Sequence, residues 1–348
     1  MLYGVKNPHG GDRYGDGIAL DFSANVSPLG TPKCVTEAIE RGLPELYRYP
    51  DPYCRALVQA IAHYEGVPGE FILCGNGASE LIYAYCEAVR PGRAMELAPT
   101  FSEYSLALQR RGCGVVRFAL SQEEKFDLQE HFLARLAHEK IDALFLCNPN
   151  NPTGTYVPIG ELEAFADTLP EDVLLVMDEA YMEFATEPDC CSMVDYMKAH
   201  LEKPILVLRT FSKYYAMAGL RVGYALGSEE LIGILRKCSA SWNLNVCAQK
   251  AAVAGLADQE YYQEQKAKIV EGREYLEKEM AALGCRVYPS QSNFIYFDTG
   301  KDPAWIQEQL MEKGIRIGAF EMSRVSVGTM EECKLYIKAL KEILEAAE

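Results

Sequence analysis

Short apolar runs alternate with amphipathic stretches through the middle of the chain. Three of the runs, DALFLC (142–147), DVLLVM (172–177) and PILVLR (204–209), are rich in Leu, Val and Ile and show no polar alternation. Strands with this composition are buried on both faces, as in parallel sheets covered by helices. Because such strands alternate here with amphipathic helices, the pattern predicts βαβ units and an α/β fold around a largely parallel sheet.

The last hundred residues have a different pattern. A long amphipathic stretch from about Glu260 to Gly284 predicts one long helix, and SNFIYF (292–297) predicts a strand. Asp302 and Pro303 form a helix-start signal, so a further helix is expected through Lys313. We therefore predict three parts: an N-terminal arm with part of a small domain (1–40), a large domain (41–245) and a small α+β domain (246–348).

The charge balance restricts the partners. Acidic residues outnumber basic ones by 50 to 34, which gives a formal net charge of −16. A chain this acidic repels nucleic-acid backbones and anionic lipid surfaces. No apolar run approaches the ~18 residues that a membrane-spanning helix needs. We expect neither nucleic acid nor a membrane as a partner.

Cysteine and histidine usage gives no sign of a metal site. The 12 cysteines are scattered and the five histidines never form H-E-x-x-H, so we expect free thiols in a reducing compartment and no bound metal. The first residues lack the apolar core of a secretory signal. A cytoplasmic protein is expected.

A polar cluster follows each of the three buried runs: NPNNPTG, DEAY and TFSK. Ligands of open α/β sheets bind outside the carboxyl ends of the strands, so these clusters are expected to share one crevice. Lys213 lies in the third cluster. Most lysines are simply solvated, but Thr210, Ser212 and Arg221 lie close to it in sequence and suit a bound phosphate.

A second candidate phosphate contact lies upstream. GNGASEL (75–81) follows an apolar run and opens an amphipathic helix, whose free N–H groups would point at an anion. Such glycine turns often do no more than connect a strand to a helix.

Asp178 ends the second buried run, and Tyr181 follows three residues later. A carboxylate in this place is either part of a salt bridge or a partner for a ligand cation. Pyridoxal phosphate is one ligand that fits, because a carboxylate keeps its ring nitrogen protonated. Tyr181 and Asn151 would then bond the ring's phenolate oxygen. Phe101 would stack on the ring, unless it is an ordinary core aromatic.

Together, NPNNPTG, DEAY and a Ser-Lys pair followed by an arginine resemble the fold type I, aspartate-aminotransferase-like pyridoxal-phosphate enzymes over essentially the whole chain. The resemblance implies a three-layer fold, with a large, mainly parallel seven-stranded sheet domain and a smaller α+β domain. It also implies that Lys213 is the Schiff-base lysine, that Asp178 faces the ring nitrogen, and that Asn151 and Tyr181 contact the phenolate oxygen.

The same resemblance implies further site residues. The cofactor phosphate would be held by Ala78, Ser79, Thr210, Ser212 and Arg221. Arg324, in SRVSVGT, would grip the carboxylate of an amino-acid substrate. Tyr49, in YRYPDP, would reach the phosphate in the neighbouring subunit, which implies a homodimer with shared active sites.

The finer motifs favour one branch of the family. HGGD (9–12), DFSANVSPLG (21–30) and WNLNVCAQ (242–249) resemble threonine-phosphate decarboxylases. We therefore predict a decarboxylase of O-phospho-L-threonine or a close analogue, whose product feeds cobalamin-type cofactors, with Asn25 and His9 as substrate contacts. The alternative is an aminotransferase that acts on histidinol phosphate or an aromatic amino acid with 2-oxoglutarate.

One position departs from the family pattern. Both phosphate-substrate families carry a second arginine where this chain has Gly318, within GIRIGAF. Arg316 would replace it only if one alternating strand kept both positions on the same face. His9, Lys6 and Arg13 are other sources of positive charge. If none of them serves, the substrate carries no phosphate.

Overall fold

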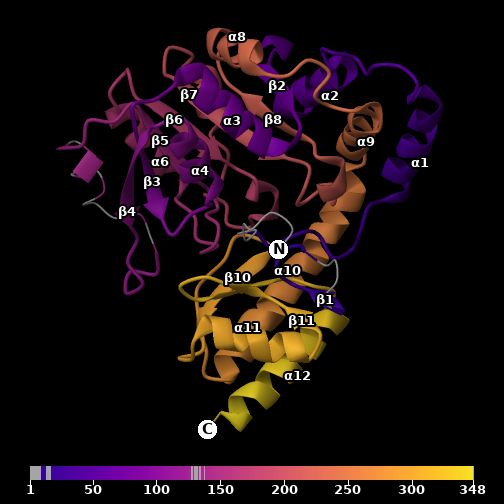
Figure 1. Cartoon of the computed structure of the whole chain (residues 1–348), viewed down its shortest axis with the longest axis vertical. Coiled ribbons are helices and arrows are strands. Elements are labelled where there is room, and N and C mark those ends of the chain that lie inside the picture. The colour runs from indigo at the N-terminus through magenta and orange to yellow at the C-terminus, as the bar shows by residue number, and fades with distance from the viewer. Residues whose placement is uncertain are drawn as a thin grey trace.

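The computed structural model describes residues 9–12, 17–126, 128, 132, 135–136 and 138–347. Lys6 and Arg13 lie outside these residues. Figure 1 shows two parts: an upper one built around a large sheet, and a lower one formed mostly by the C-terminal third of the chain. The boundaries at residues 40 and 245 stay predictions.

The upper part contains a seven-stranded sheet. In spatial order its strands are β2 (Ile72–Gly75), β8 (Gly223–Leu226), β7 (Ile205–Thr210), β6 (Leu174–Asp178), β5 (Ala143–Cys147), β3 (Arg93–Ala98) and β4 (Gly114–Ala119). β8 is antiparallel to both of its neighbours, and all other pairs are parallel. The three apolar runs of the sequence correspond to β5, β6 and β7. The predicted α/β class and mainly parallel sheet are confirmed.

Helices cover both faces of this sheet. Alternate residues of each strand point to opposite sides, so each strand packs against both helical layers. Leu144 and Leu146 face one helical layer, and Ala143 and Phe145 face the other. The first layer consists of α2 (Arg55–Glu65), α6 (Ile159–Thr168) and α7 (Val194–Ala199). The second consists of α3 (Gly77–Val89), α4 (Glu103–Arg110) and α8 (Glu229–Cys238). This arrangement is the three-layer fold that the resemblance implies.

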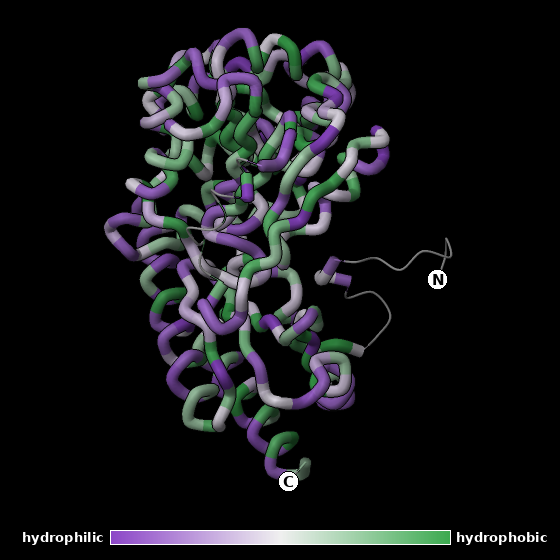
Figure 2. Tube along the Cα trace, turned by 90° about the vertical axis from the view of Figure 1, so that its left-hand side faces the viewer, coloured by the Kyte–Doolittle hydropathy of each residue, from purple (hydrophilic) through white to green (hydrophobic). Residues whose placement is uncertain are grey.

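The lower part is α+β. Its four-stranded antiparallel sheet has the order β12 (Gly318–Ala319), β13 (Ser323–Ser326), β10 (Phe294–Asp298) and β9 (Arg286–Val287). A separate parallel pair joins β1 (Leu20–Asp21) to β11 (Ile315–Arg316). The helices are α10 (Gln259–Ala282), α11 (Pro303–Glu312) and α12 (Met330–Ala346). Hydrophobic and hydrophilic residues alternate along the outer helical turns in Figure 2, as expected for helices with one buried face.

Arg316 and Gly318 belong to different sheets, because the chain passes from β11 to β12 at Ile317. Arg316 could replace the missing arginine only from a single alternating strand that also contains Gly318, and this condition is not met. The remaining long helices, α1 (Lys33–Gly42) and α9 (Val246–Ala257), pack against each other beside the large sheet, where a Cβ on Gly42 would lie 3.3 Å from Cys247 Sγ.

Candidate functional site

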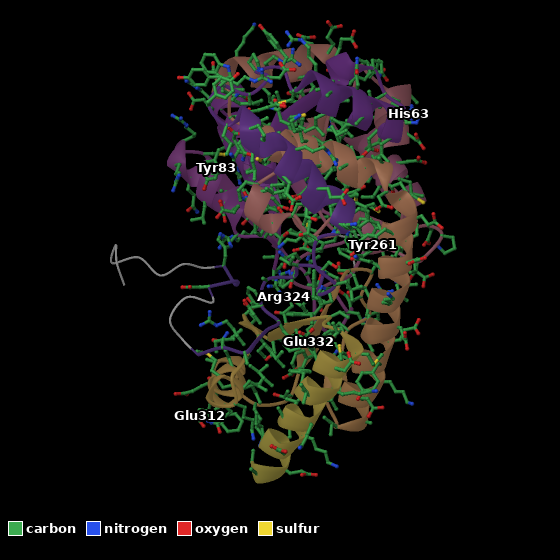
Figure 3. All side chains as sticks on the ribbon, turned by 90° about the vertical axis from the view of Figure 1, so that its right-hand side faces the viewer. His63, Tyr83, Tyr261, Glu312, Arg324 and Glu332 are labelled. Carbon is green, nitrogen blue, oxygen red and sulfur yellow. The ribbon has the colours of Figure 1, made fainter. Side chains whose placement is uncertain are left out.

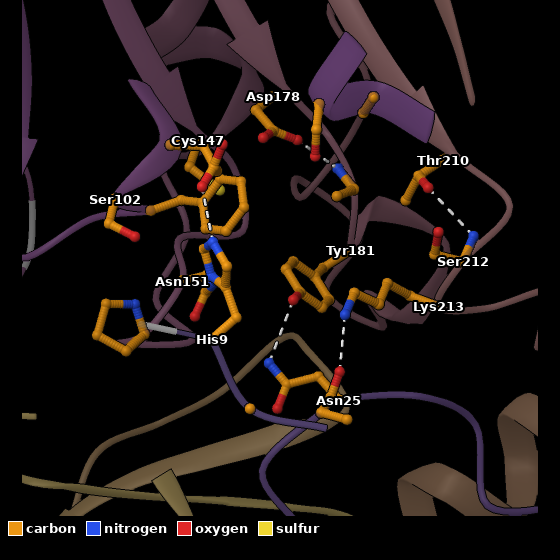
Figure 4. Close-up of a pocket in the computed structure, with 18 of the residues that line it drawn as sticks. His9, Asn25, Ser102, Cys147, Asn151, Asp178, Tyr181, Thr210, Ser212 and Lys213 are labelled. Carbon is orange, nitrogen blue, oxygen red and sulfur yellow. Dashed lines mark hydrogen bonds and ion pairs between the residues drawn. The ribbon is translucent and has the colours of Figure 1, made fainter. Parts of the chain in front are cut away.

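A cavity of about 440 Å³ opens at the carboxyl ends of β5, β6 and β7. Figure 4 shows polar side chains converging on it from several strands. Apart from Tyr49, every site residue expected from the sequence lines the cavity: His9, Asn25, Ala78, Ser79, Phe101, Asn151, Asp178, Tyr181, Thr210, Ser212, Lys213, Arg221 and Arg324. The strand-end clusters therefore do share one crevice. Their individual chemical roles stay predictions.

Lys213 presents its amine to the cavity just beyond β7. Its Nζ donates a hydrogen bond to the carbonyl oxygen of Ala24 at 2.7 Å, drawn as a dashed line in Figure 4. Burial, followed by the nearby positive charges of Arg324 and Arg221, lowers the pKa of Lys213 to about 7. A substantial fraction of this amine is therefore neutral at neutral pH, and the neutral amine is the nucleophilic form.

Asp178 is the last residue of β6 and is buried. Oδ1 accepts the N–H of Ala180 at 3.0 Å, and Oδ2 accepts the hydroxyl of Tyr104 at 2.6 Å. Burial raises the pKa of Asp178, while the hydrogen bond from Tyr104 opposes that rise. Both donors are neutral, so the carboxylate is held in place and its charge is left for a ligand.

Tyr181 and Asn25 form a second fixed pair. Asn25 Nδ2 donates to the Tyr181 hydroxyl at 3.2 Å, and Ser326 Oγ donates to Asn25 Oδ1 at 2.7 Å. Both polar ends of the Asn25 side chain are thus engaged within the protein. Because the Tyr181 oxygen accepts a hydrogen bond from Asn25, the hydroxyl proton of Tyr181 is left for another acceptor. Tyr181 lines the cavity together with Lys213 and Asn151.

The end of the cavity near α3 is built for an anion. Asn76, at the helix N-cap, makes no side-chain capping bond, so the first N–H groups of α3 remain available. Arg221 Nη1 donates to Ser212 Oγ at 3.3 Å. A Cβ on Gly77 would lie 2.4 Å from Arg221 Nη2, and one on Gly223 would lie 2.5 Å from the backbone nitrogen of Ala78. Only glycines let these groups approach so closely.

Arg324 lies on β13, where the upper and lower parts of the chain meet (Figure 3). Nη2 donates to the Ser23 carbonyl at 2.7 Å, and Nη1 donates to Asn151 Oδ1. Nε is buried without a hydrogen-bond partner, and the residue forms no ion pair with the described residues. Burial accordingly lowers the pKa of Arg324. A buried guanidinium without a counter-ion is a binding point for an anion.

His9 is held at the cavity by Glu103. His9 Nε2 lies 2.6 Å from Glu103 Oε1, and the Tyr83 hydroxyl donates to Glu103 Oε2 at 2.9 Å. The imidazole also packs on Phe101, with ring centroids 5.7 Å apart. Glu103 therefore brings a carboxylate to the cavity that sequence reasoning did not select.

Tyr49 is not brought to the cavity of its own chain. Its side chain is 76% exposed and stacks on Trp242 with ring centroids 4.5 Å apart. A role in a neighbouring subunit stays a prediction.

Sequence reasoning missed several residues at the site, among them Tyr104, Glu103 and Phe320. The segment APTFSEY contains two of them, since Glu103 and Tyr104 follow Phe101 closely and begin α4 (Glu103–Arg110). Phe320 lies in the turn between β12 and β13 and has no sequence signal of this kind.

Among the described residues no group of His, Cys, Asp and Glu could hold a metal ion. None of the helices in the described ranges has the length and apolar character to cross a membrane.

Comparison with known proteins decides the family. The sequence model of "Aminotransferase class I and II" matches residues 18–340. The chain belongs to this family. Histidinol-phosphate aminotransferase from Moorella thermoacetica is 34% identical, covering 93% of this chain and 85% of that protein. Histidinol-phosphate aminotransferase 2 from Carboxydothermus hydrogenoformans is 36% identical over 93% of this chain and 91% of that protein.

Solved structures agree on the fold. Histidinol-phosphate aminotransferase from Sinorhizobium meliloti, in complex with pyridoxal-5'-phosphate, superposes with a TM-score of 0.88 at 29% identity, covering 95% of this chain and 92% of that one. L-threonine-O-3-phosphate decarboxylase from Porphyromonas gingivalis gives 0.82 at 24% identity, covering 94% and 99%, which shows the fold alone. These relatives favour the aminotransferase alternative over the decarboxylase that the finer motifs predicted.

The protein is an enzyme of the fold type I superfamily, and its cofactor is pyridoxal phosphate. The cavity fits this group at each end. The glycine-lined anion site beside α3 matches a phosphate, and the buried carboxyl group of Asp178, whose hydrogen-bond donors are neutral, matches a protonated ring nitrogen. The neutral amine of Lys213 matches an aldehyde.

Proposed function

We propose that this enzyme is an aminotransferase that takes the amino group from histidinol phosphate or an aromatic amino acid and passes it to a 2-oxo acid. The observation that carries the proposal is the placement of a buried amine of lowered pKa, Lys213, in one cavity with the unpaired guanidinium of Arg324. The names of relatives at 34% and 36% identity support the substrate.

When bound, the cofactor supplies an aldehyde for covalent attachment and a ring that withdraws electrons from the substrate. The protein holds it in place. Asp178 would hold the ring nitrogen, Tyr181 would donate its proton to the ring oxygen, and Arg221 with the first turn of α3 would hold the phosphate. Phe101 would stack on the ring.

The substrate's anionic group binds Arg324, which fixes the amine-bearing carbon in the cavity that Lys213 also faces. Lys213 Nζ then acts as the base that accepts the proton from this carbon. In transamination that proton must be moved by a nearby group, and the lowered pKa of Lys213 suits its Nζ to accept and release it near neutral pH.

We also propose a homodimer in which Tyr49 reaches the phosphate of the neighbouring subunit's cofactor. The support is a surface that we call the aromatic patch: Leu43, Leu46, Tyr47, Tyr49, Tyr53 and Trp242, all largely exposed. Exposed apolar clusters of this kind on a single chain usually mark an interface.

The activity is tested with purified holoenzyme. L-Histidinol phosphate and 2-oxoglutarate together are expected to yield glutamate, with no glutamate when either is left out. In parallel, O-phospho-L-threonine is supplied without any 2-oxo acid and released CO2 is measured. Rapid CO2 release, with no glutamate from any amino donor, would reject the aminotransferase in favour of the decarboxylase.

A further inference from the structure

The residue before α3 does not cap the helix. Asn76 is of a type that often does so, because its side-chain oxygen can accept an N–H of the first turn. Here its Nδ2 donates to the backbone oxygen of Asn243 at 2.8 Å, and the side chain makes no capping bond. The first-turn N–H groups, which a capping side chain would occupy, are therefore left for the cofactor phosphate.

A glutamate and a second asparagine hold this turn. Glu80 lies in the first turn of α3, and its Oε2 accepts the backbone N–H of Asn76. Asn243 Nδ2 donates to the same Oε2 at 2.7 Å and also lies 3.3 Å from the carbonyl oxygen of Cys74, to which it donates as well. We call Glu80 and Asn243 the loop clamp. It fixes the connection from β2 to α3 on both sides.

Asn243 is itself held in place by the helix that follows it. It lies between α8 and α9, 163 positions from Glu80, and the next residue, Leu244, is buried. The carbonyl oxygen of Leu244 accepts Gln249 Nε2 of α9 at 2.8 Å, and the side chain of Asn245 caps the same helix. The loop clamp therefore ties the anion site to a well-anchored distant segment.

The charge of Glu80 does not explain its place beside an anion site. A carboxylate in the first turn stabilises a helix, but it repels a bound phosphate. Ala78 and Ser79 line the cavity, whereas Glu80 and Asn243 are not among the described residues that do so. What Glu80 supplies is one acceptor oxygen for two donors.

We propose that Glu80 and Asn243 are positioning residues for the cofactor phosphate. They hold Asn76 with its side chain turned away from α3, and so they keep the first-turn N–H groups open to the phosphate. The inference rests on the part of the proposed function that places the phosphate at α3, and it deepens that part by assigning two residues that act through the turn.

The first test compares pyridoxal phosphate with pyridoxal, which has the same aldehyde and ring but no phosphate. Dissociation constants of both for the apoenzyme are measured by fluorescence quenching. Glu80→Ala and Asn243→Ala should each weaken pyridoxal phosphate by about 10-fold and leave pyridoxal nearly unchanged. A merely structural defect would weaken both ligands alike. Glu87→Ala is the matched control, because Glu87 lies two turns further along α3 and pairs with Arg90 and Arg111.

The second test separates the oxygen of Glu80 from its charge. Because both donors meet a single oxygen, the amide oxygen of glutamine can accept both hydrogen bonds. Glu80→Gln also removes the charge that repels phosphate, so pyridoxal phosphate should bind at least as tightly as to the unaltered enzyme. The double variant Glu80→Ala with Asn243→Ala should lose little more than Glu80→Ala alone, because both changes break the same hydrogen bond.

An equal loss for both ligands in Glu80→Ala, or the same loss in Glu80→Gln as in Glu80→Ala, overturns the loop clamp. Arg221→Ala distinguishes this failure from that of the proposed function. If Arg221→Ala selectively weakens pyridoxal phosphate while Glu80→Ala does not, the phosphate binds beside α3 and only the loop clamp is rejected. If neither variant is selective, the placement of the phosphate is rejected as well.

Discussion

Lys213 has an amine whose environment makes it reactive. The amine donates a hydrogen bond to a backbone carbonyl, and burial, followed by the charges of Arg324 and Arg221, disfavours its protonated form. Because the pKa is lowered, the reactive neutral form becomes the main form when the pH rises above about 7, instead of above 10.5, the ordinary value.

This gives a prediction for the apoenzyme. Labelling of Lys213 by trinitrobenzenesulfonate, followed by mass spectrometry between about pH 5 and 10, should rise with a midpoint near neutrality. Lys33 on α1 provides the internal control, since its side chain is exposed to solvent. Parallel titration of both lysines would contradict the effect of burial.

Tyr104 acts through Asp178. Tyr104→Phe removes a 2.6 Å hydrogen bond from a buried carboxylate without changing the packing of the ring. A hydrogen bond to a charged group contributes ~1.5–3 kcal/mol, so we expect kcat to fall by about 10-fold or more with little change in KM. The pH at which the cofactor's absorbance changes should shift as well, because the pKa of Asp178 rises further.

Tyr85→Phe is the matched control. Tyr85 is equally buried and packs against the same Phe145, but its hydroxyl has no hydrogen-bond partner among the residues that the structure describes. Its kinetics and absorbance profile should match the unaltered enzyme. If both variants behave alike, Tyr104 contributes packing only and does not position Asp178.

At the scale of elements, the start of α3 depends on one glycine. Gly77 has φ +79° and leaves room for Arg221 Nη2. Gly77→Ala strains the backbone and pushes the guanidinium away, so cofactor affinity should fall by about 10-fold or more. The measurement is the dissociation constant of pyridoxal phosphate.

Gly233, in the middle of α8, tests the opposite case. A Cβ there would meet nothing within 4 Å, and its backbone is not left-handed. Gly233→Ala should therefore stabilise the protein by ~1 kcal/mol and leave cofactor affinity unchanged.

Tighter or unchanged cofactor binding in Gly77→Ala would contradict the role of Gly77.

The elements that hold the site were predictable because they are buried on both faces. β5, β6 and β7 appear in the sequence as apolar runs, and the polar residues that follow them meet because parallel strands end at one edge. Residues placed by turns were not predictable. The passage from one sheet to another at Ile317 and the position of Phe320 depend on contacts with distant strands, which no local pattern records.

At the scale of the whole molecule, the aromatic patch predicts association. Leu46→Asp places a charge within the patch and should lower the mass observed by sedimentation from dimer to monomer, with weaker cofactor binding because Tyr49 of the neighbour is lost. Leu335→Asp, a similarly exposed position on α12, should leave the mass unchanged. A monomeric unaltered enzyme would reject both the dimer and the shared site.

The segment Ser23–Asn25 contacts residues from distant parts of the sequence close to the reactive amine of Lys213. Ala24 accepts from Lys213, Ser23 accepts from Arg324, and Asn25 bonds both Tyr181 and Ser326. Arg324 and Ser23 are 301 positions apart in the sequence. The site is therefore complete only when β13 has docked beside the Ser23–Asn25 segment, and a partly folded molecule without this contact holds neither Arg324 nor Lys213 in place.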